Sequence, residues 1–297
     1  MSKSDNKFVD GSEEFLLHFF DQPQSQKIET INQLLSRHPS WPILYHLSPQ
    51  RQLLLEWYDF NPSLTLLEIG AGCGALTQLF LRKVHRVTCL ELEPIRSKII
   101  KKRYADYPHL KTVSAHLTDF HPKTKFNYIT LVGVLEYAGK YFYPQNNDYS
   151  YQPFIDCLSS VKQLLNRDGL VFIAIENKLG LKYLAACPED HYGSVFESVE
   201  DYPHYCGIRT FSKSEIVTIL KSAGFGHVNF YYPFPDYKLP QHIYSQDFIH
   251  QNFATFLANF PSTLRQSSIN QTLLAKSIFD ADLIDQFCNS FLIIAQI

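Results

Sequence analysis

Three glycines separated by single residues lie between a short apolar segment and an amphipathic one, and they have an immediate chemical use. Gly70, Gly72 and Gly74 follow Leu64–Ile69, which predicts a strand, and precede Ala75–Lys83, which predicts a helix. Glycine lets the backbone take positive φ values and approach a ligand closely, and a helix offers free N–H groups at its start. The pattern predicts a nucleotide-binding loop.

The glycines alone do not distinguish two kinds of cofactor, because Gly70, Gly72 and Ala75 also fit the dinucleotide fingerprint G-x-G-x-x-G/A. Two acidic residues discriminate. Glu68 precedes the loop, where a carboxylate would repel a pyrophosphate but suits a ligand with an ammonium group. Glu91 ends the next predicted strand, where a carboxylate can accept hydrogen bonds from both ribose hydroxyls. Both residues favour S-adenosylmethionine over a nicotinamide cofactor.

A family resemblance rests on four segments in this order: LLEIGAGCGALT, VTCLELEP, FNYITLVGVLEYA and LLNRDGLVFIAIEN. They resemble the successive motifs of class I S-adenosylmethionine-dependent methyltransferases. The resemblance implies a Rossmann-like α/β sheet of seven strands with an antiparallel last strand, and a transferase with S-adenosyl-L-methionine as cofactor. More narrowly, VLEYA, IENKLGLKYL, PEDH and FYYPFPDYKLP resemble a bacterial subgroup linked with surface-polysaccharide biosynthesis.

The resemblance also implies which residues surround the cofactor. The glycine loop would pack against the methionine part, His116 and Leu117 would flank the adenine, and Gly133 and Val134 would lie near the sulfonium. Tyr45, on a helix before the core, either caps the cofactor or packs as an ordinary core residue. The predicted cofactor-binding residues are Tyr45, Glu68, Gly70, Ala71, Gly72, Gly74, Glu91, Leu92, His116, Leu117, Gly133 and Val134.

Residues that act on the acceptor are expected after the predicted fourth and fifth strands, Phe126–Val132 and Leu170–Ile175, since ligands in such folds bind beyond the carboxyl ends of the strands. Methyl transfer needs positioning, exclusion of water and, for some acceptors, a general base. His191, beside two acids, is either that base or part of a solvated loop. Glu136 is either catalytic or a helix N-terminal acid. The predicted catalytic residues are Glu136, Tyr137, Glu176, Asn177 and His191.

Short apolar strands that alternate with helices must position these residues. Further strands are predicted at 85–91, 111–115, 228–232 and 290–297, and helices at 13–20, 27–37, 48–58, 94–104, 151–166 and 212–223. Alternation of this kind predicts a parallel sheet covered on both faces. Trp41-Pro42 is expected to interrupt the first helices, and Asp168-Gly169 predicts a turn. Asp236, Tyr237 and Lys238 follow the sixth strand and could enter the acceptor site.

The element order predicts three parts of the chain. Residues 1–62 would form a helical cap, residues 63–241 together with 290–297 the cofactor-binding core, and residues 242–289 a helical insertion that forms part of the acceptor pocket.

Composition limits the possible partners. Apolar residues make up 45% of the 297 residues, which predicts a sizeable buried core. The 27 basic and 29 acidic residues give a net charge of −2, so we expect a small-molecule acceptor and no nucleic acid. The chain lacks an apolar run of spanning length, so no membrane span is predicted. Six scattered cysteines without metal-ligand spacing predict a cytoplasmic protein with no metal.

Three functions remain open on the sequence. The first is a methyltransferase that acts on a small-molecule or glycan-type acceptor. The second is an enzyme that closes the aminobutyrate chain of the cofactor into a ring and releases methylthioadenosine, which an aromatic site around the sulfonium would favour. The 14% aromatic content is compatible with this alternative. The third is a non-catalytic module that only binds S-adenosylmethionine.

Overall fold

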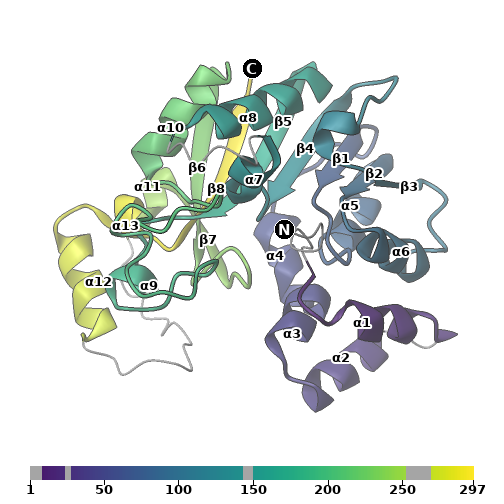
Figure 1. The fold of residues 1–297 in the computed structure, drawn as a ribbon, viewed down its shortest axis with the longest axis horizontal. Coiled ribbons are helices and arrows are strands. Elements are labelled where there is room, and N and C mark those ends of the chain that lie inside the picture. Colours follow the sequence, from purple (N-terminus) through teal and green to yellow (C-terminus); the bar gives the residue numbers. More distant parts are fainter. Residues whose placement is uncertain (1–8, 24–27, 143–149, 252–268) are drawn as a thin grey trace. The chain divides into compact units, whose positions relative to one another are not determined.

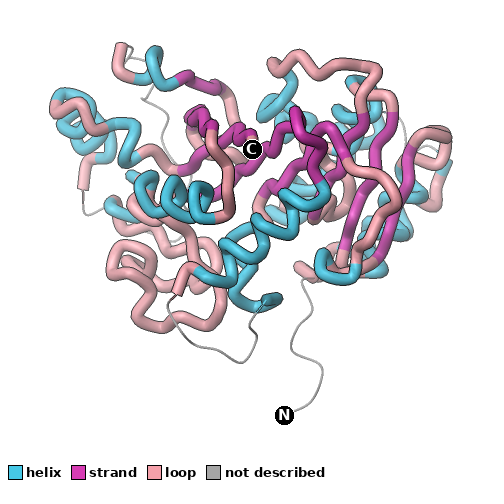
Figure 2. Tube along the Cα trace, turned by 90° about the horizontal axis from the view of Figure 1, so that it is seen from above, coloured by secondary structure: helices cyan, strands magenta, loops and turns pink. Residues whose placement is uncertain are grey.

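The computed structural model describes residues 9–23, 28–142, 150–251 and 269–297. Its strands form one eight-stranded sheet in the order β3-β2-β1-β4-β5-β8-β6-β7 (Figure 1). The chain divides into two compact units, Met1–Thr130 and Leu131–Ile297, and strand β4 (Phe126–Val132) runs across the division. Helices, strands and loops alternate along the described chain (Figure 2). Among the described residues, no helix combines the length and the apolar character needed to cross a bilayer.

The first unit begins with helices and continues into parallel strands. Its elements before β4 are α1 (Glu13–Phe20), α2 (Ile28–Arg37), α3 (Trp41–Leu47), the 3₁₀ turn η2 (Pro49–Gln52), α4 (Leu53–Glu56), β1 (Thr65–Ile69), α5 (Thr77–Lys83), β2 (Arg86–Glu91), α6 (Pro94–Arg103), β3 (Leu110–Ser114) and the 3₁₀ turn η3 (Leu117–Asp119). Strands β1 and β3 both pair with β2 in parallel. Their carboxyl ends therefore lie at one edge of the sheet, where Glu68 near the end of β1 and Glu91 at the end of β2 are placed.

The N-terminal helices are attached to the strands through an apolar cluster. Leu16, Phe20, Leu34, Leu47 and Ile99 belong to this cluster and are buried, and α1 packs against α6. The pair Trp41-Pro42, expected to interrupt the helices, instead begins α3. A proline is tolerated there because the first turn of a helix has no internal partner for its N–H.

The second unit contains the antiparallel part of the sheet. Its elements after β4 are the 3₁₀ turn η4 (Leu135–Tyr137), α7 (Ala138–Phe142), α8 (Gln152–Leu164), β5 (Leu165–Glu176), α9 (Leu181–Leu184), α10 (Lys213–Ser222), β6 (His227–Phe234), β7 (His242–Ser245), α11 (Gln246–Ile249), α12 (Gln271–Asp280), α13 (Ile284–Phe287) and β8 (Ser290–Gln296). Strand β8 lies between β5 and β6 and is antiparallel to both. This confirms the predicted return of the last strand into the sheet.

Two expectations about the second unit are wrong. The sheet has eight strands and not seven, because β7 pairs with β6 at the edge. Its four residues, HIYS, place Ile243 and Tyr244 side by side, so the sequence has no alternation of apolar and polar residues that would predict a strand. Asp168-Gly169 is not a turn but part of β5, which begins at Leu165.

The predicted division into cap, core and insertion stays a prediction. The segment assigned to the insertion, 242–289, includes residues 252–268, which lie outside the described residues. Its described part holds one strand and three short or medium helices, α11, α12 and α13.

Helix α10 begins with a capping box, in which a serine and a glutamate satisfy each other's backbone groups. Ser212 Oγ accepts a hydrogen bond from the backbone N–H of Glu215, and the Glu215 carboxylate accepts one from the backbone N–H of Ser212 at 2.8 Å. We expect Ser212→Ala to lower the free energy of unfolding by about 1 kcal/mol, because it removes one of these bonds. Urea denaturation would measure the change. Ser222→Ala, at the exposed end of α10, is the control, and an equal effect of both variants would contradict the prediction.

Candidate cofactor and acceptor sites

The turn after β1 depends on its glycines. Gly70, Gly72 and Gly74 have φ values of 68°, 56° and 83°, in the region that L side chains rarely adopt. The Gly70 N–H donates to the carbonyl of Leu90 at 2.8 Å, which ties the turn to the end of β2. A Cβ on Gly74 would come within 2.8 Å of the Tyr104 ring. Side chains at these positions would therefore strain the turn.

Glu91 holds this turn from the neighbouring strand end. Its carboxylate is 5% exposed. Oε2 accepts a hydrogen bond from the Gly72 N–H at 2.7 Å, and Oε1 accepts one from the Glu93 N–H at 3.0 Å. Burial raises the pKa of Glu91. Because each carboxylate oxygen has two lone-pair directions, Glu91 can still accept hydrogen bonds from ligand hydroxyls.

Glu68 lies on β1 and is buried. Its Oε2 accepts a hydrogen bond from Thr77 Oγ1 at 2.6 Å and lies 3.4 Å from Cys89 Sγ. Burial raises the pKa of the Glu68 carboxyl to about 7. An ammonium group placed beside it would stabilise the ionised form, so this residue fits the amino group of S-adenosylmethionine.

The other predicted cofactor residues of the first unit surround the same strand ends. A Cβ on Gly72 would meet only His46 Cε1, at 4.0 Å, so the space above the turn is open. The Arg51 guanidinium lies over the Tyr45 ring, 4.0 Å from the ring centroid. Ala71 is buried and Leu92 half-buried, and half-buried His116 and Leu117 follow β3. The donor and acceptor groups present here fit the cofactor that the sequence predicts.

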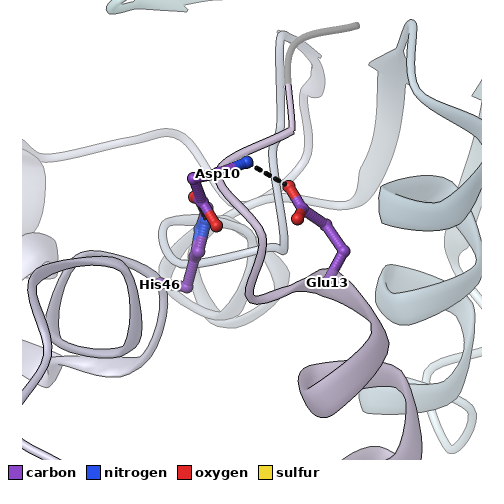
Figure 3. Close-up of side chains that lie close together, drawn as sticks. All are labelled: Asp10, Glu13 and His46. Carbon is purple, nitrogen blue, oxygen red and sulfur yellow. Dashed lines mark hydrogen bonds and ion pairs between the residues drawn. The ribbon is translucent and has the colours of Figure 1, made fainter.

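A cluster that the sequence did not reveal fixes the N-terminal residues beside this turn. Asp10 Oδ2 lies 2.6 Å from His46 Nε2. The Glu13 carboxylate accepts hydrogen bonds from the N–H of Asp10, as Figure 3 shows, and from that of Gly11. Arg96 also donates to Glu13, at 2.8 and 2.9 Å. Burial lowers the pKa of His46. Only the acidic start of α1 hinted at this arrangement, and its partners are distant in sequence.

In the second unit, the residues after β4 form a tight turn. Gly133 has a φ of 70°, and its N–H donates to the carbonyl of Ala174 at 2.9 Å. Val134 follows, half-buried, and Glu136 on η4 is 1% exposed. The turn therefore directs Glu136 into the protein interior, next to the end of β5.

His191 joins Glu136 to the loop after β5. His191 Nδ1 lies 2.9 Å from Glu189 Oε1, and Nε2 lies 3.8 Å from Glu136 Oε1. The Tyr137 ring packs edge-on against the imidazole, with 5.3 Å between centroids. Burial alone would lower the pKa of His191, but the hydrogen bond to Glu189 and the nearby carboxylates of Glu136 and Glu176 outweigh it and raise the pKa to about 10. The structure therefore brings together three of the predicted catalytic residues, Glu136, Tyr137 and His191.

Glu176, the last residue of β5, connects this group to two lysines. Its Oε1 accepts hydrogen bonds from Tyr237 Oη at 3.2 Å and from Lys238 Nζ. Lys238 also donates to Asp190 at 2.8 Å. Lys182 donates to Asp190 at 2.6 Å and to Asp236 at 2.8 Å. We call Glu136, Glu176, Glu189, Asp190, Asp236, Lys182, Lys238 and His191 the acidic cluster.

The side chains of Asp236, Tyr237 and Lys238, which follow β6, therefore contact this cluster. That they enter an acceptor site stays a prediction. The ion pairs of Lys182 were not predicted, because their partners are distant in sequence and only packing reveals them.

Asn177 makes its hydrogen bonds with backbone groups. Its amide Nδ2 donates to the carbonyls of Gln286 and Cys288, both at 2.8 Å, and its Oδ1 accepts from the N–H of Leu179 at 3.0 Å. The side-chain amide therefore bonds backbone groups and stabilises the loop after β5. None of these three hydrogen bonds joins Asn177 to another predicted catalytic side chain, so its catalytic role stays a prediction.

A separate groove of about 550 Å³ lies between α1 and α3 in the first unit. Asp10, Phe15, Arg37, His38 and Ser40 are among its lining residues. None of the predicted cofactor or catalytic residues lines it.

The fold and the strand-end acids define an S-adenosylmethionine-binding enzyme of the Rossmann-like class. The chain belongs to the methyltransferase domain family, whose model matches residues 43–229. This family and this fold are those of S-adenosylmethionine-dependent methyltransferases.

Solved structures share this fold. A SAM-dependent methyltransferase from Archaeoglobus fulgidus is 14% identical, with 87% of this chain and 100% of that chain covered and a TM-score of 0.51. Phosphoethanolamine N-methyltransferase 2 from Haemonchus contortus, solved with S-adenosylhomocysteine, is 16% identical, with coverages of 95% and 59% and a TM-score of 0.50.

A curated relative matches over a shorter segment. Ribosomal RNA small subunit methyltransferase A from Alkaliphilus metalliredigens is 31% identical over 61 residues, which are 20% of this chain and 21% of that protein. The chain thus spans about a fifth of the length of this relative.

The raised pKa of Glu68 predicts a pH-dependent stability. A folded-state pKa of about 7 against an ordinary value of 4.5 means that the folded protein holds this proton more tightly than the unfolded chain. The stability from Glu68 is therefore complete below about pH 4.5 and is lost as the pH rises through about 7. Relative to Glu68→Gln, the wild type should lose up to about 3 kcal/mol of unfolding free energy between pH 5 and 8. Urea denaturation at several pH values would measure this, and parallel curves for both proteins would refute it.

The role of Glu91 predicts a loss of cofactor affinity. We expect Glu91→Ala to weaken the binding of S-adenosylhomocysteine by about 1–3 kcal/mol, because a charged hydrogen-bond acceptor and the anchor of the glycine turn are both removed. Isothermal titration calorimetry would measure the affinity. Glu93→Ala is the matched control, since it removes a carboxylate from the same turn but keeps both hydrogen bonds to Glu91. Unchanged affinity in Glu91→Ala would show that the ribose contact is misassigned.

Proposed function

We propose that the enzyme methylates a small-molecule or glycan-type acceptor, which binds at the acidic cluster. The observation that carries this proposal is the convergence of the segments after β4, β5 and β6 on one buried polar site around Glu136, Glu176 and His191. Carboxylates accept hydrogen bonds from hydroxyl and ammonium groups. Tyrosine adds an apolar ring face beside a polar tip, and Tyr137 and Tyr237 both contact members of the cluster. Such a mixture suits a polyhydroxylated or amino-bearing acceptor.

Charge supports a small acceptor over a nucleic acid. The acidic cluster has five carboxylates and only two lysines, and each lysine is already paired with carboxylates. A phosphate backbone would be repelled there.

The proposed roles divide between cofactor and acceptor residues. When bound, S-adenosylmethionine supplies a methyl group on a positively charged sulfur. Glu68 would hold its amino group, Glu91 its ribose, and the glycine turn would let the methionine part approach the backbone. Glu136, Tyr137 and His191 would position the acceptor, and the burial of this face would exclude water. Asn177 would act by shaping the loop that carries His191.

The cofactor-cyclising alternative has weaker support. It requires aromatic faces around the sulfonium. The ring of Tyr45, the aromatic residue predicted at the cofactor, is already occupied by the guanidinium of Arg51 at 4.0 Å. No other described contact favours ring closure of the cofactor.

Product analysis by mass spectrometry tests the proposal. With S-adenosylmethionine alone, we expect no turnover. With pools of sugar nucleotides, amino sugars and other polar metabolites, S-adenosylhomocysteine should form together with an acceptor that gains one methyl group. The Glu91→Ala variant should lose this activity in the same pools because it binds the cofactor poorly. Release of methylthioadenosine from the cofactor alone would establish the cyclising reaction instead, and methylation confined to added RNA would refute a small-molecule acceptor.

A further inference from the structure

Two carboxylate oxygens in the acidic cluster are buried without a hydrogen-bond partner among the described residues. They are Glu136 Oε2 and Glu176 Oε2, on residues that are 1% and 0% exposed. A buried acceptor that loses its water and gains no donor destabilises the folded state, and more so when it is charged. Such oxygens indicate that a cationic group belongs beside them.

The cationic side chains of the cluster are already engaged elsewhere. Lys182 pairs with Asp190 and Asp236, and Lys238 pairs with Glu176 Oε1 and Asp190. His191 Nε2 is 3.8 Å from Glu136 Oε1, which is longer than a hydrogen bond. The protein therefore supplies no close donor to the second oxygen of either glutamate within the described residues.

The spacing of the three side chains suits a metal ion. One donor atom from each of Glu136, Glu176 and His191 lies within 4.8 Å of the other two. Imidazole nitrogens and carboxylate oxygens bind Zn²⁺ at about 2.0–2.2 Å. Two ligands of one ion are therefore at most about 4–4.5 Å apart, and small side-chain rotations would bring these atoms to that separation.

Glu189 orients the imidazole for this purpose. Its Oε1 lies 2.9 Å from His191 Nδ1, and its Oε2 accepts the N–H groups of His191 and Tyr192 at 2.7 and 2.9 Å. A carboxylate that accepts the Nδ1–H of a histidine leaves Nε2 for a metal, and metal-binding histidines commonly have such a partner. On Glu176, Tyr237 and Lys238 occupy Oε1 and leave Oε2 available.

A second group with the same residue types provides a contrast. Asp10, Glu13 and His46 also have donor atoms within 4.8 Å of one another. There, however, Arg96 and the N–H groups of Asp10 and Gly11 bond both oxygens of Glu13. Residue types and spacing are shared by the two groups, whereas unpartnered buried oxygens are found only in the first.

We propose that Glu136, Glu176 and His191 bind one divalent transition-metal ion, with Glu189 as the residue that positions His191. The mixture of two carboxylates and one imidazole suits Mn²⁺ or Zn²⁺. The site would bind the ion whatever the acceptor of the methyl group is.

Metal binding to the full chain tests this site directly. Protein freed of metal with a chelator is dialysed against MnCl₂ or ZnCl₂, and bound metal is counted by mass spectrometry of the elements. We expect one ion per chain. Glu136→Gln and Glu176→Gln should each weaken binding by at least about tenfold, and Glu189→Gln by about 10–100-fold, as for second-sphere partners of metal ligands. Glu13→Gln, in the contrasting group, should leave metal binding unchanged.

Two further readouts separate the possible failures. Retained binding of S-adenosylhomocysteine would show that the variants fold and that the cofactor site is independent of the metal. If a variant does not fold, Co²⁺ added to the wild type should produce visible absorption bands that Zn²⁺ removes. Absence of stoichiometric metal in the wild type, or equal binding by Glu136→Gln, Glu176→Gln and the wild type, would overturn the proposal.

Discussion

The buried carboxylate of Glu91 is the interaction on which the cofactor end of the first unit depends. It joins the turn after β1 to the turn after β2 through the N–H groups of Gly72 and Glu93. Hydrogen bonds to a charged group contribute about 1.5–3 kcal/mol each, and here they add to the bond from the Gly74 N–H to the Ala71 carbonyl within the turn. The same carboxylate keeps lone pairs for a ligand. Support of the fold and recognition of the cofactor are thus combined in one side chain.

The second unit meets a related constraint with many more charges. Five carboxylates are gathered where the segments after β4, β5 and β6 converge, and burial of so much negative charge requires cations close by. Lys182 and Lys238 supply two, and their ion pairs connect α9 to the residues after β6. The loop containing His191 is therefore positioned by charge balance as much as by apolar packing. An enzyme can change its acceptor by altering such a loop while the sheet stays intact.

Sequence reasoning succeeded where local patterns are strong. Strand β4 and helix α1 match their predicted ranges, because continuous apolar runs and an acidic helix start are local signals. The capping box at Ser212 marks the start of α10 in the same way. Prediction failed for β7, whose sequence HIYS has no alternating pattern. It also missed the pairing of Asp10 with His46, since contacts between distant residues follow from packing and not from spacing.

The position of β8 has a consequence for how the protein is made. Its residues lie between β5 and β6 and pair with both, yet they follow every other element of the second unit in the chain. During synthesis, β5 and β6 therefore leave the ribosome with open, apolar edges and must wait for the strand that separates them. Exposed strand edges of this kind favour aggregation. A nascent chain stopped before Ser290 would lack the strand that joins β6 to β5, so the antiparallel part of the sheet could not form.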